Sequence, residues 1–134
     1  MKKLLFLTII ALCLFSCQKH SAVKIEPGAG RLVLDKDTFD FEEIGDREPP
    51  VSHTFHITNG GTDPLVINKV EAGCECTTVE YTKEPIPSGE EGELKVTLDP
   101  SKMQFGHAFR TIQVYSNTKG SPKTVTLKAN IIDK

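Results

Sequence analysis

The sequence predicts an all-β protein, a single immunoglobulin-like β-sandwich of about seven to eight strands. From residue 31 onward, short runs of alternating apolar and polar residues recur about every eight to fifteen positions, and turn-forming Gly, Pro, Asn and Asp separate them. No stretch shows the 3.6-residue periodicity of an amphipathic helix. These two observations assign residues 31–134 to one sandwich domain.

Residues 1–16 are predicted to form a lipoprotein signal peptide. The chain opens with Met-Lys-Lys, and the apolar run that follows is too short to span a bilayer as a stable helix. The run ends in Leu-Phe-Ser-Cys, which resembles the lipobox of bacterial lipoproteins, so Cys17 is the expected lipidation site. An uncleaved anchor or an ordinary secretory leader is the alternative. Residues 17–30, with Pro27, Gly28 and Gly30, then form a flexible lipidated tether.

Charge argues against nucleic acid as a partner. Lys2 and Lys3 belong to the predicted signal peptide, so 14 of the 16 basic residues remain beside 18 acidic ones, a net charge of about −4. A mildly acidic surface cannot neutralise many phosphates. The residues after Cys17, Gln-Lys-His, contain no acidic run, which favours an outer-membrane lipoprotein that faces the periplasm.

Four strands are expected before the cysteine pair of the domain, because side chains at alternate positions of a strand point to the same face. The inward residues are Leu32 and Leu34, then Phe39 and Phe41, then Val51, Phe55 and Ile57, then Leu65 and Ile67. His53 shares the inward parity of Val51 and Phe55. We interpret it as a strand-end histidine held by a hydrogen bond, whereas His56 faces solvent.

Three strands are expected after the cysteine pair. Their inward residues are Leu94, Val96 and Leu98, then Ile112 and Val114, then Val125, Leu127, Ala129 and Ile131. Phe109 lies on the opposite parity to Ile112, which predicts a β-bulge near Arg110. About twenty inward side chains suffice for a domain of this size to fold alone.

A series of short motifs resembles the domain of unknown function 1573 family. The motifs are Phe-Asp-Phe at 39–41, Thr-Asn-Gly-Gly at 58–61, Pro-Leu-Val-Ile at 64–67, Gly-Cys-Glu-Cys-Thr at 73–77, Ile-Pro-Ser-Gly at 86–89 and Val-Tyr-Ser-Asn at 114–117. The resemblance covers roughly residues 31 to 132 and implies a bacterial secreted or lipidated sandwich, related in shape to pilus chaperones and major sperm proteins. It implies no activity. The family often has Gly where this chain has Glu75.

The pair Cys74 and Cys76 is the candidate site. Residues two apart in a regular strand lie about 6.6 to 6.8 Å apart at Cα, whereas disulfides prefer about 5.5 to 6 Å. A bond between these cysteines therefore requires a bend, which Gly73 would permit. The small ring would be readily reduced, as thiol–disulfide exchange requires. The alternatives are a static structural disulfide, or two reduced thiols of which one faces the core.

No metal, cofactor or catalytic residue is expected. A soft ion such as copper(I) on Cys74, Cys76, Met103 and His107 is a weak alternative, because the Cys-x-Cys motif supplies only two ligands. The sequence lacks a G-x-S-x-G elbow, a His-Glu-x-x-His motif and a Gly-rich phosphate loop between strand and helix. We therefore do not expect an enzyme.

The predicted function is that of a binding or adaptor module in the cell envelope, joined to the membrane by the lipid on Cys17 and to an envelope protein by its loops. Loops cluster at the ends of a sandwich, so the expected surfaces are residues 74–83 and residues 99–107. The alternative is a periplasmic protein that uses Cys74 and Cys76 for thiol–disulfide exchange or copper(I) handling.

Overall fold

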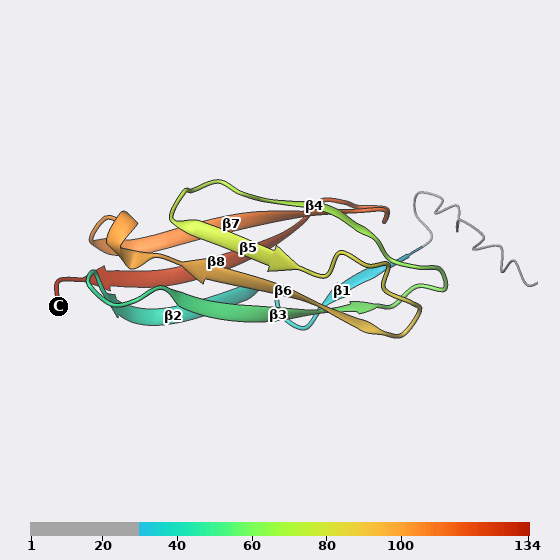
Figure 1. Cartoon of the computed structure of the whole chain (residues 1–134), viewed down its shortest axis with the longest axis horizontal. Helices are drawn as coiled ribbons and strands as arrows, with labels where there is room; N and C mark the ends of the chain where they lie inside the picture. The colour runs from blue at the N-terminus through green and yellow to red at the C-terminus, as the bar shows by residue number, and fades with distance from the viewer. Residues whose placement is uncertain (1–29) are drawn as a thin grey trace, which may run out of the picture.

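The computed structural model describes residues 30–134, which form two four-stranded β-sheets packed face to face (Figure 1). The strands are β1 (Leu32–Leu34), β2 (Thr38–Gly45), β3 (Val51–Asn59), β4 (Ile67–Ala72), β5 (Thr77–Tyr81), β6 (Glu91–Leu98), β7 (Gly106–Ser116) and β8 (Lys123–Ile132). The strand orders are β1-β3-β6-β5 and β2-β8-β7-β4. The predicted all-β sandwich is confirmed, with eight strands among the described residues.

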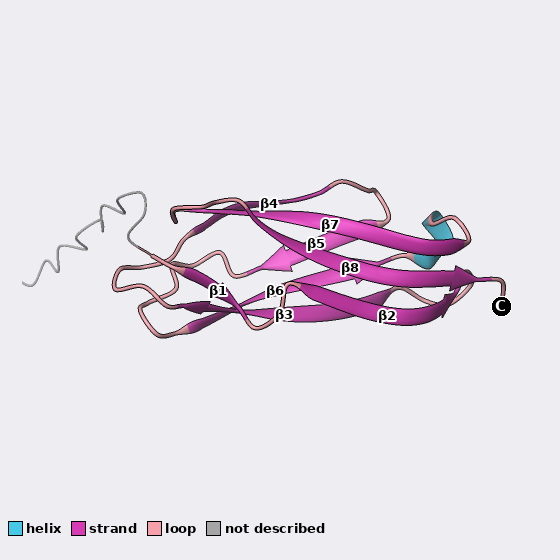
Figure 2. Cartoon of the chain, turned by 180° about the vertical axis from the view of Figure 1, so that it is seen from behind, coloured by secondary structure: helices cyan, strands magenta, loops and turns pink. Residues whose placement is uncertain are grey.

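The predicted signal peptide, Cys17 and the predicted tether up to residue 29 lie outside the described residues. Between residues 30 and 134, no helix has the length and apolarity needed to cross a membrane. The one helical segment between the strands is a short 3₁₀ turn, η2 (Pro100–Lys102), which Figure 2 shows at the same end of the sandwich as the C-terminus.

Alternation builds the core as the sequence predicts. On β6, Leu94, Val96 and Leu98 are buried, while the residues between them face outward. The same pattern on β8 buries Val125 and Leu127 between the sheets. Burying an aliphatic side chain of this size stabilises the fold by about 1.5 to 3 kcal/mol, so these alternating rows supply most of the driving force.

The bulge predicted near Arg110 is wrong. Pairing between β7 and β8 runs without a register shift from Gly106 to Val114. Phe109 instead points outward and is 60% exposed, and Arg110 has the inward parity of Ile112. The prediction failed because it assumed that the larger apolar side chain must face the core, whereas apolar side chains are common on protein surfaces.

The loop predicted for residues 74–83 is wrong in part, because residues 77–81 form the strand β5. β5 is an edge strand that pairs on one side only, with β6, and its sequence is Thr-Thr-Val-Glu-Tyr. Its two core-facing residues after Thr77 are only half-buried. The preceding strand β4 pairs with β7 in the other sheet. The chain therefore crosses from one sheet to the other between β4 and β5, at the cysteine pair.

The strand register shows that β1 and the cysteine pair lie at opposite ends of the sandwich. Leu32 of β1 lies opposite Asn59, the last residue of β3, whereas the first residue of β3, Val51, lies opposite Leu98, which also pairs with Thr77. A strand of nine residues is roughly 30 Å long. The chain thus enters the domain at one end, and the cysteine pair lies at the other, which we call the distal end (Figure 1).

A buried asparagine holds the entry end together. Asn59 is 0% exposed, and its Oδ1 accepts hydrogen bonds from the backbone N–H groups of Arg31 and Gly61. Its Nδ2 donates to the carbonyl oxygens of Asp63 and Ile86. The Thr-Asn-Gly-Gly motif therefore joins β1, the turn after β3 and the loop before β6 through one fully satisfied amide.

Candidate functional site

Cys74 and Cys76 form a disulfide at the sheet crossover, with a Cα–Cα distance of 5.1 Å and an S–S distance of 2.03 Å. The backbone bends in a tight turn, in which the Thr77 N–H donates to the Cys74 carbonyl at 3.1 Å. The Cys76 N–H donates to Cys74 Sγ at 3.1 Å. Gly73 is not among the residues with positive φ, so the bend does not depend on the conformational freedom of that glycine.

The two sulfur atoms have different surroundings. Cys76 is 2% exposed, and its Sγ lies 3.7 Å from Thr77 Oγ1. Cys74 is half-buried and lines an open depression of about 370 Å³. The other residues that line this depression are Gly73, Thr77, Phe109, Arg110 and Thr111. A molecule that reaches the disulfide from solvent therefore meets Cys74 first.

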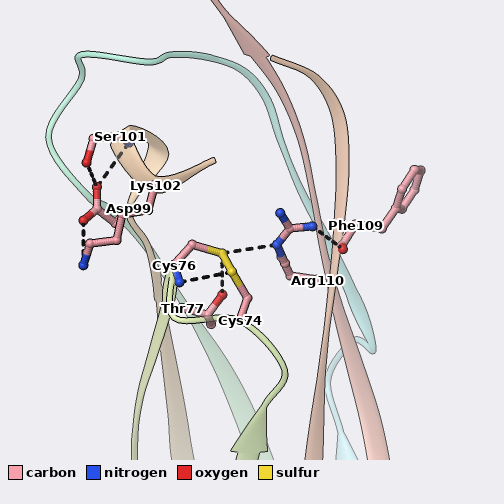
Figure 3. The surroundings of a disulfide bond; sticks show 8 residues. All are labelled: Cys74, Cys76, Thr77, Asp99, Ser101, Lys102, Phe109 and Arg110. Carbon is pink, nitrogen blue, oxygen red and sulfur yellow. Dashed lines mark hydrogen bonds and ion pairs between the residues drawn. A yellow bond between two sulfur atoms is a disulfide. The ribbon is translucent and has the colours of Figure 1, made fainter. Parts of the chain in front are cut away.

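Arg110 reaches the disulfide from the opposite sheet. Its Nε donates to Cys76 Sγ at 3.2 Å, and its Nη1 donates to the Phe109 carbonyl at 2.9 Å (Figure 3). No ion pair within residues 30–134 includes Arg110. A half-buried guanidinium therefore has a sulfur atom as its side-chain partner in place of a carboxylate.

Asp99, the acidic residue closest to Arg110 in the sequence, is engaged elsewhere. The Asp99 N–H donates to the Cys76 carbonyl at 2.9 Å, so the loop that starts at Asp99 lies beside the disulfide turn. The Asp99 carboxylate, however, accepts from the Ser101 hydroxyl at 2.6 Å and pairs with Lys102 at 3.3 Å. The bond from Ser101 is the main reason that the pKa of Asp99 is lowered. Figure 3 shows this carboxylate directed at Ser101 and Lys102 rather than at Arg110.

The remaining candidate residues do not join the cysteines. Met103 packs against the hydrophobic core, and His107 lies exposed on β7. Neither residue lines the depression beside Cys74. Across residues 30–134, no group of three or more His, Cys, Asp or Glu side chains is arranged to hold a metal ion.

His53 faces inward on β3, but the hydrogen bond expected for it is missing at its buried Nε2, which has no partner in the described part of the chain. Aromatic contacts hold the ring instead. It stacks on Phe39 with 3.6 Å between ring centroids and meets Phe55 edge to face. Burial is the main cause that lowers the pKa of His53, and the charge of Lys36 adds to it.

Two exposed aromatic side chains lie next to the site. Phe105 is 66% exposed and Phe109 is 60% exposed, and both line an open cleft of about 530 Å³ that Arg110 also borders. We call these two phenylalanines the distal aromatic surface. Lys128 lies with its Nζ 5.9 Å from the centre of the Phe109 ring. Counting parity back from Ile112 would have placed Arg110 inward and Phe109 outward.

Together, these features define a small immunoglobulin-like sandwich with a local disulfide at a sheet crossover. The chain belongs to the family described as Protein of unknown function (DUF1573), whose model matches residues 32–131. The resemblance predicted from the motifs is thereby confirmed. No curated protein sequence matches the chain.

Solved structures support the fold. A protein of unknown function from Porphyromonas gingivalis W83 has a TM-score of 0.70 at 18% identity, over 84% of this chain and 51% of that one. The ASH / PapD-like domain 7 of human CEP192 has a TM-score of 0.63 at 10% identity, over 81% and 89%. The YadV chaperone has a TM-score of 0.56 at 11% identity, over 75% and 51%. This chain thus spans about half of the first and third structures. At these identities, the likeness extends to the fold alone.

Proposed function

We propose that the protein is a lipid-anchored binding module of the outer membrane that faces the periplasm, has no enzymatic activity, and holds an envelope protein at its distal end. The observation that supports this most is the distal aromatic surface. Among residues 30–134, the large apolar side chains that are exposed are Val33, Phe105 and Phe109, and two of these three adjoin one cleft. Clustered exposed aromatic residues are typical of the anchors of protein interfaces.

The position of this surface fits an anchored adaptor. A lipid on Cys17 would tether the domain through residues 17–30, and Gly30 directly precedes Arg31, whose N–H donates to Asn59 at the entry end of the sandwich. The distal aromatic surface lies at the other end, roughly one strand length of 30 Å away. The lipidated end would thus rest near the membrane while the two phenylalanines extend toward a partner in the periplasm.

The test is capture of the partner in the native host with a photo-crosslinking amino acid. A probe at Phe109 is expected to trap a defined protein, and a probe at Val33, the matched exposed apolar residue at the entry end, is expected to trap none. The double variant Phe105→Ser/Phe109→Ser, probed at Thr111, should lose the product. Equal capture from both ends, or capture that survives the double variant, would refute the proposal. Incorporation of labelled palmitate that Cys17→Ser abolishes tests the anchor separately.

Thiol–disulfide exchange is the second candidate function, and the disulfide beside Arg110 is the observation that favours it. Copper(I) handling is the weaker form of this candidate, because a disulfide offers no thiolate ligand and Met103 packs against the core, away from the depression beside Cys74. The test compares free thiols on the native protein before and after millimolar dithiothreitol. Reduction of the native fold supports exchange, whereas reduction that requires unfolding rules it out and leaves a static disulfide.

A further inference from the structure

The disulfide offers an incoming nucleophile two unequal sulfur atoms. Cys74 lines the open depression, whereas Cys76 is 2% exposed and lies beneath the turn. Exchange requires a thiolate to approach one sulfur in line with the S–S bond while the other sulfur leaves. Access from solvent therefore selects Cys74 as the sulfur that is attacked and Cys76 as the sulfur that leaves.

The surroundings of Cys76 suit a leaving thiolate. Arg110 Nε donates to Cys76 Sγ at 3.2 Å, and Thr77 Oγ1 lies 3.7 Å from the same atom. Hydrogen bonds to a charged acceptor are roughly twice as strong as those to a neutral one, so both contacts gain strength when Cys76 becomes a thiolate. Arg110 has no ion pair within residues 30–134, and reduction of the disulfide would supply one.

The same geometry selects the kind of reductant. After a thiolate has attacked Cys74, the Cys76 thiolate remains two residues away and can attack Cys74 again, which expels the incoming group. A monothiol is therefore returned to solution. A dithiol escapes this reversal, because its second thiolate can attack its own first sulfur, which is bonded to Cys74. The dithiol then leaves as a disulfide, oxidised by two electrons.

We infer that Cys74 and Cys76 form a directional exchange disulfide that accepts two electrons from a dithiol. A thiolate of the dithiol attacks Cys74 Sγ, the Cys74–Cys76 bond breaks, and the electron pair stays on Cys76 Sγ beside Arg110. The second thiolate then attacks the first sulfur of the dithiol and releases Cys74, which takes a proton from water. The dithiol is oxidised to a disulfide and the cysteine pair is reduced. This inference rests on the second candidate function above.

The position of attack can be read on the unmodified protein. The full-length protein in detergent is mixed briefly with glutathione, quenched with an alkylating agent and digested, and mass spectrometry locates the adducts. The expected product has glutathione on Cys74 and the alkyl group on Cys76, and it stays a minor species, whereas dithiothreitol reduces the pair fully. Glutathione on Cys76, or reduction by glutathione as fast as by dithiothreitol at matched thiolate concentration, would overturn the inference.

The role of Arg110 is tested by rate. Arg110→Met should slow reduction by dithiothreitol about tenfold, whereas Arg110→Lys, which keeps the charge, should stay within about threefold of the wild type. Equal rates for all three proteins would overturn the directional mechanism while the second candidate function stands. A wild-type disulfide that is reduced only after unfolding would refute both the directional mechanism and the second candidate function. A reduced small dithiol protein in place of dithiothreitol then distinguishes a protein partner from a small-molecule one.

Discussion

Arg110 Nε lies 3.2 Å from Cys76 Sγ, and this contact joins the two sheets at the distal end of the sandwich. Arg110 comes from β7 of one sheet, and Cys76 directly precedes β5 of the other. An inward-facing charge is expensive to desolvate unless an opposite charge or good acceptors surround it. A disulfide sulfur is a weak acceptor, so the contact stabilises the oxidised protein little and a reduced Cys76 thiolate much more.

Arg110→Met should therefore change the stability of the two redox states differently. In the oxidised protein, the free energy of unfolding should stay the same or rise by up to about 1 kcal/mol, because a half-buried charge without a counter-ion is removed. In the reduced protein it should fall by about 1 to 2 kcal/mol, because a hydrogen bond to a thiolate is lost. Urea titrations with and without reductant measure both values. A loss of the same size in both states would mean that Arg110 contributes only packing.

Asn59→Ala should destabilise the domain by about 3 kcal/mol or more. The substitution removes four hydrogen bonds, from the N–H groups of Arg31 and Gly61 and to the carbonyls of Asp63 and Ile86, and each such bond contributes about 0.5 to 1.5 kcal/mol. Chemical denaturation measures the change. The matched control is Asn68→Ala on exposed β4, which should shift stability by less than about 0.5 kcal/mol. Similar losses for the two variants would contradict this role.

The sequence predicts a strand well where alternation alone determines which side chains are buried, and poorly where the neighbouring strands determine it. Period-two alternation predicted the core rows of β3, β6 and β8, because those strands lie inside a sheet and bury one face fully. It missed β5, an edge strand whose Thr77–Tyr81 sequence is mostly polar and which is only half-covered. It also misplaced Phe109, because hydrophobicity was given more weight than parity.

The site was predictable only in part for the same reason. Spacing alone showed that Cys74 and Cys76 could bond only if the chain bent between them, and the structure places the crossover between sheets at that point. The partner Arg110 is 34 positions away in the sequence, on β7 of the other sheet. Local patterns contain no information on such a contact, although the inward parity of Arg110 is an unusual feature that could have drawn attention to it.

Glu42→Gly should stabilise the domain by about 0.5 to 1 kcal/mol. Glu42 adopts φ of 60° where β2 shifts register against β8, a conformation that costs an L-residue about 1 kcal/mol and a glycine almost nothing. The Asp40 carboxylate accepts from the Glu42 backbone N–H, so that bond survives the change. Thermal unfolding measures the gain. Glu43→Gly, exposed on the same strand without positive φ, should instead destabilise, and a gain in both variants would argue against relief of strain.

His53 should make the stability depend on pH below about 6.5. Its pKa is lowered in the fold, first by burial and then by Lys36, with Asp35 opposing and His56 adding to the shift. The unfolded chain therefore takes up a proton near the ordinary value of 6.5 while the folded protein stays neutral there. Between that value and the folded pKa, the unfolded state binds more protons, so stability falls as pH falls and then levels off. Above pH 7 this contribution is constant.

His53→Phe isolates this effect, because a phenyl ring can keep the stack on Phe39 but cannot take up a proton. The free energy of unfolding of this variant should change less than that of the wild type between pH 7 and pH 5, as urea titrations at each pH would measure. The control is His56→Gln, on the exposed face of the same strand, which should keep most of the wild-type slope because His53 and the burial that mainly lowers its pKa are intact. A slope that His56→Gln removes and His53→Phe retains would place the pH dependence on the outer face of β3 instead.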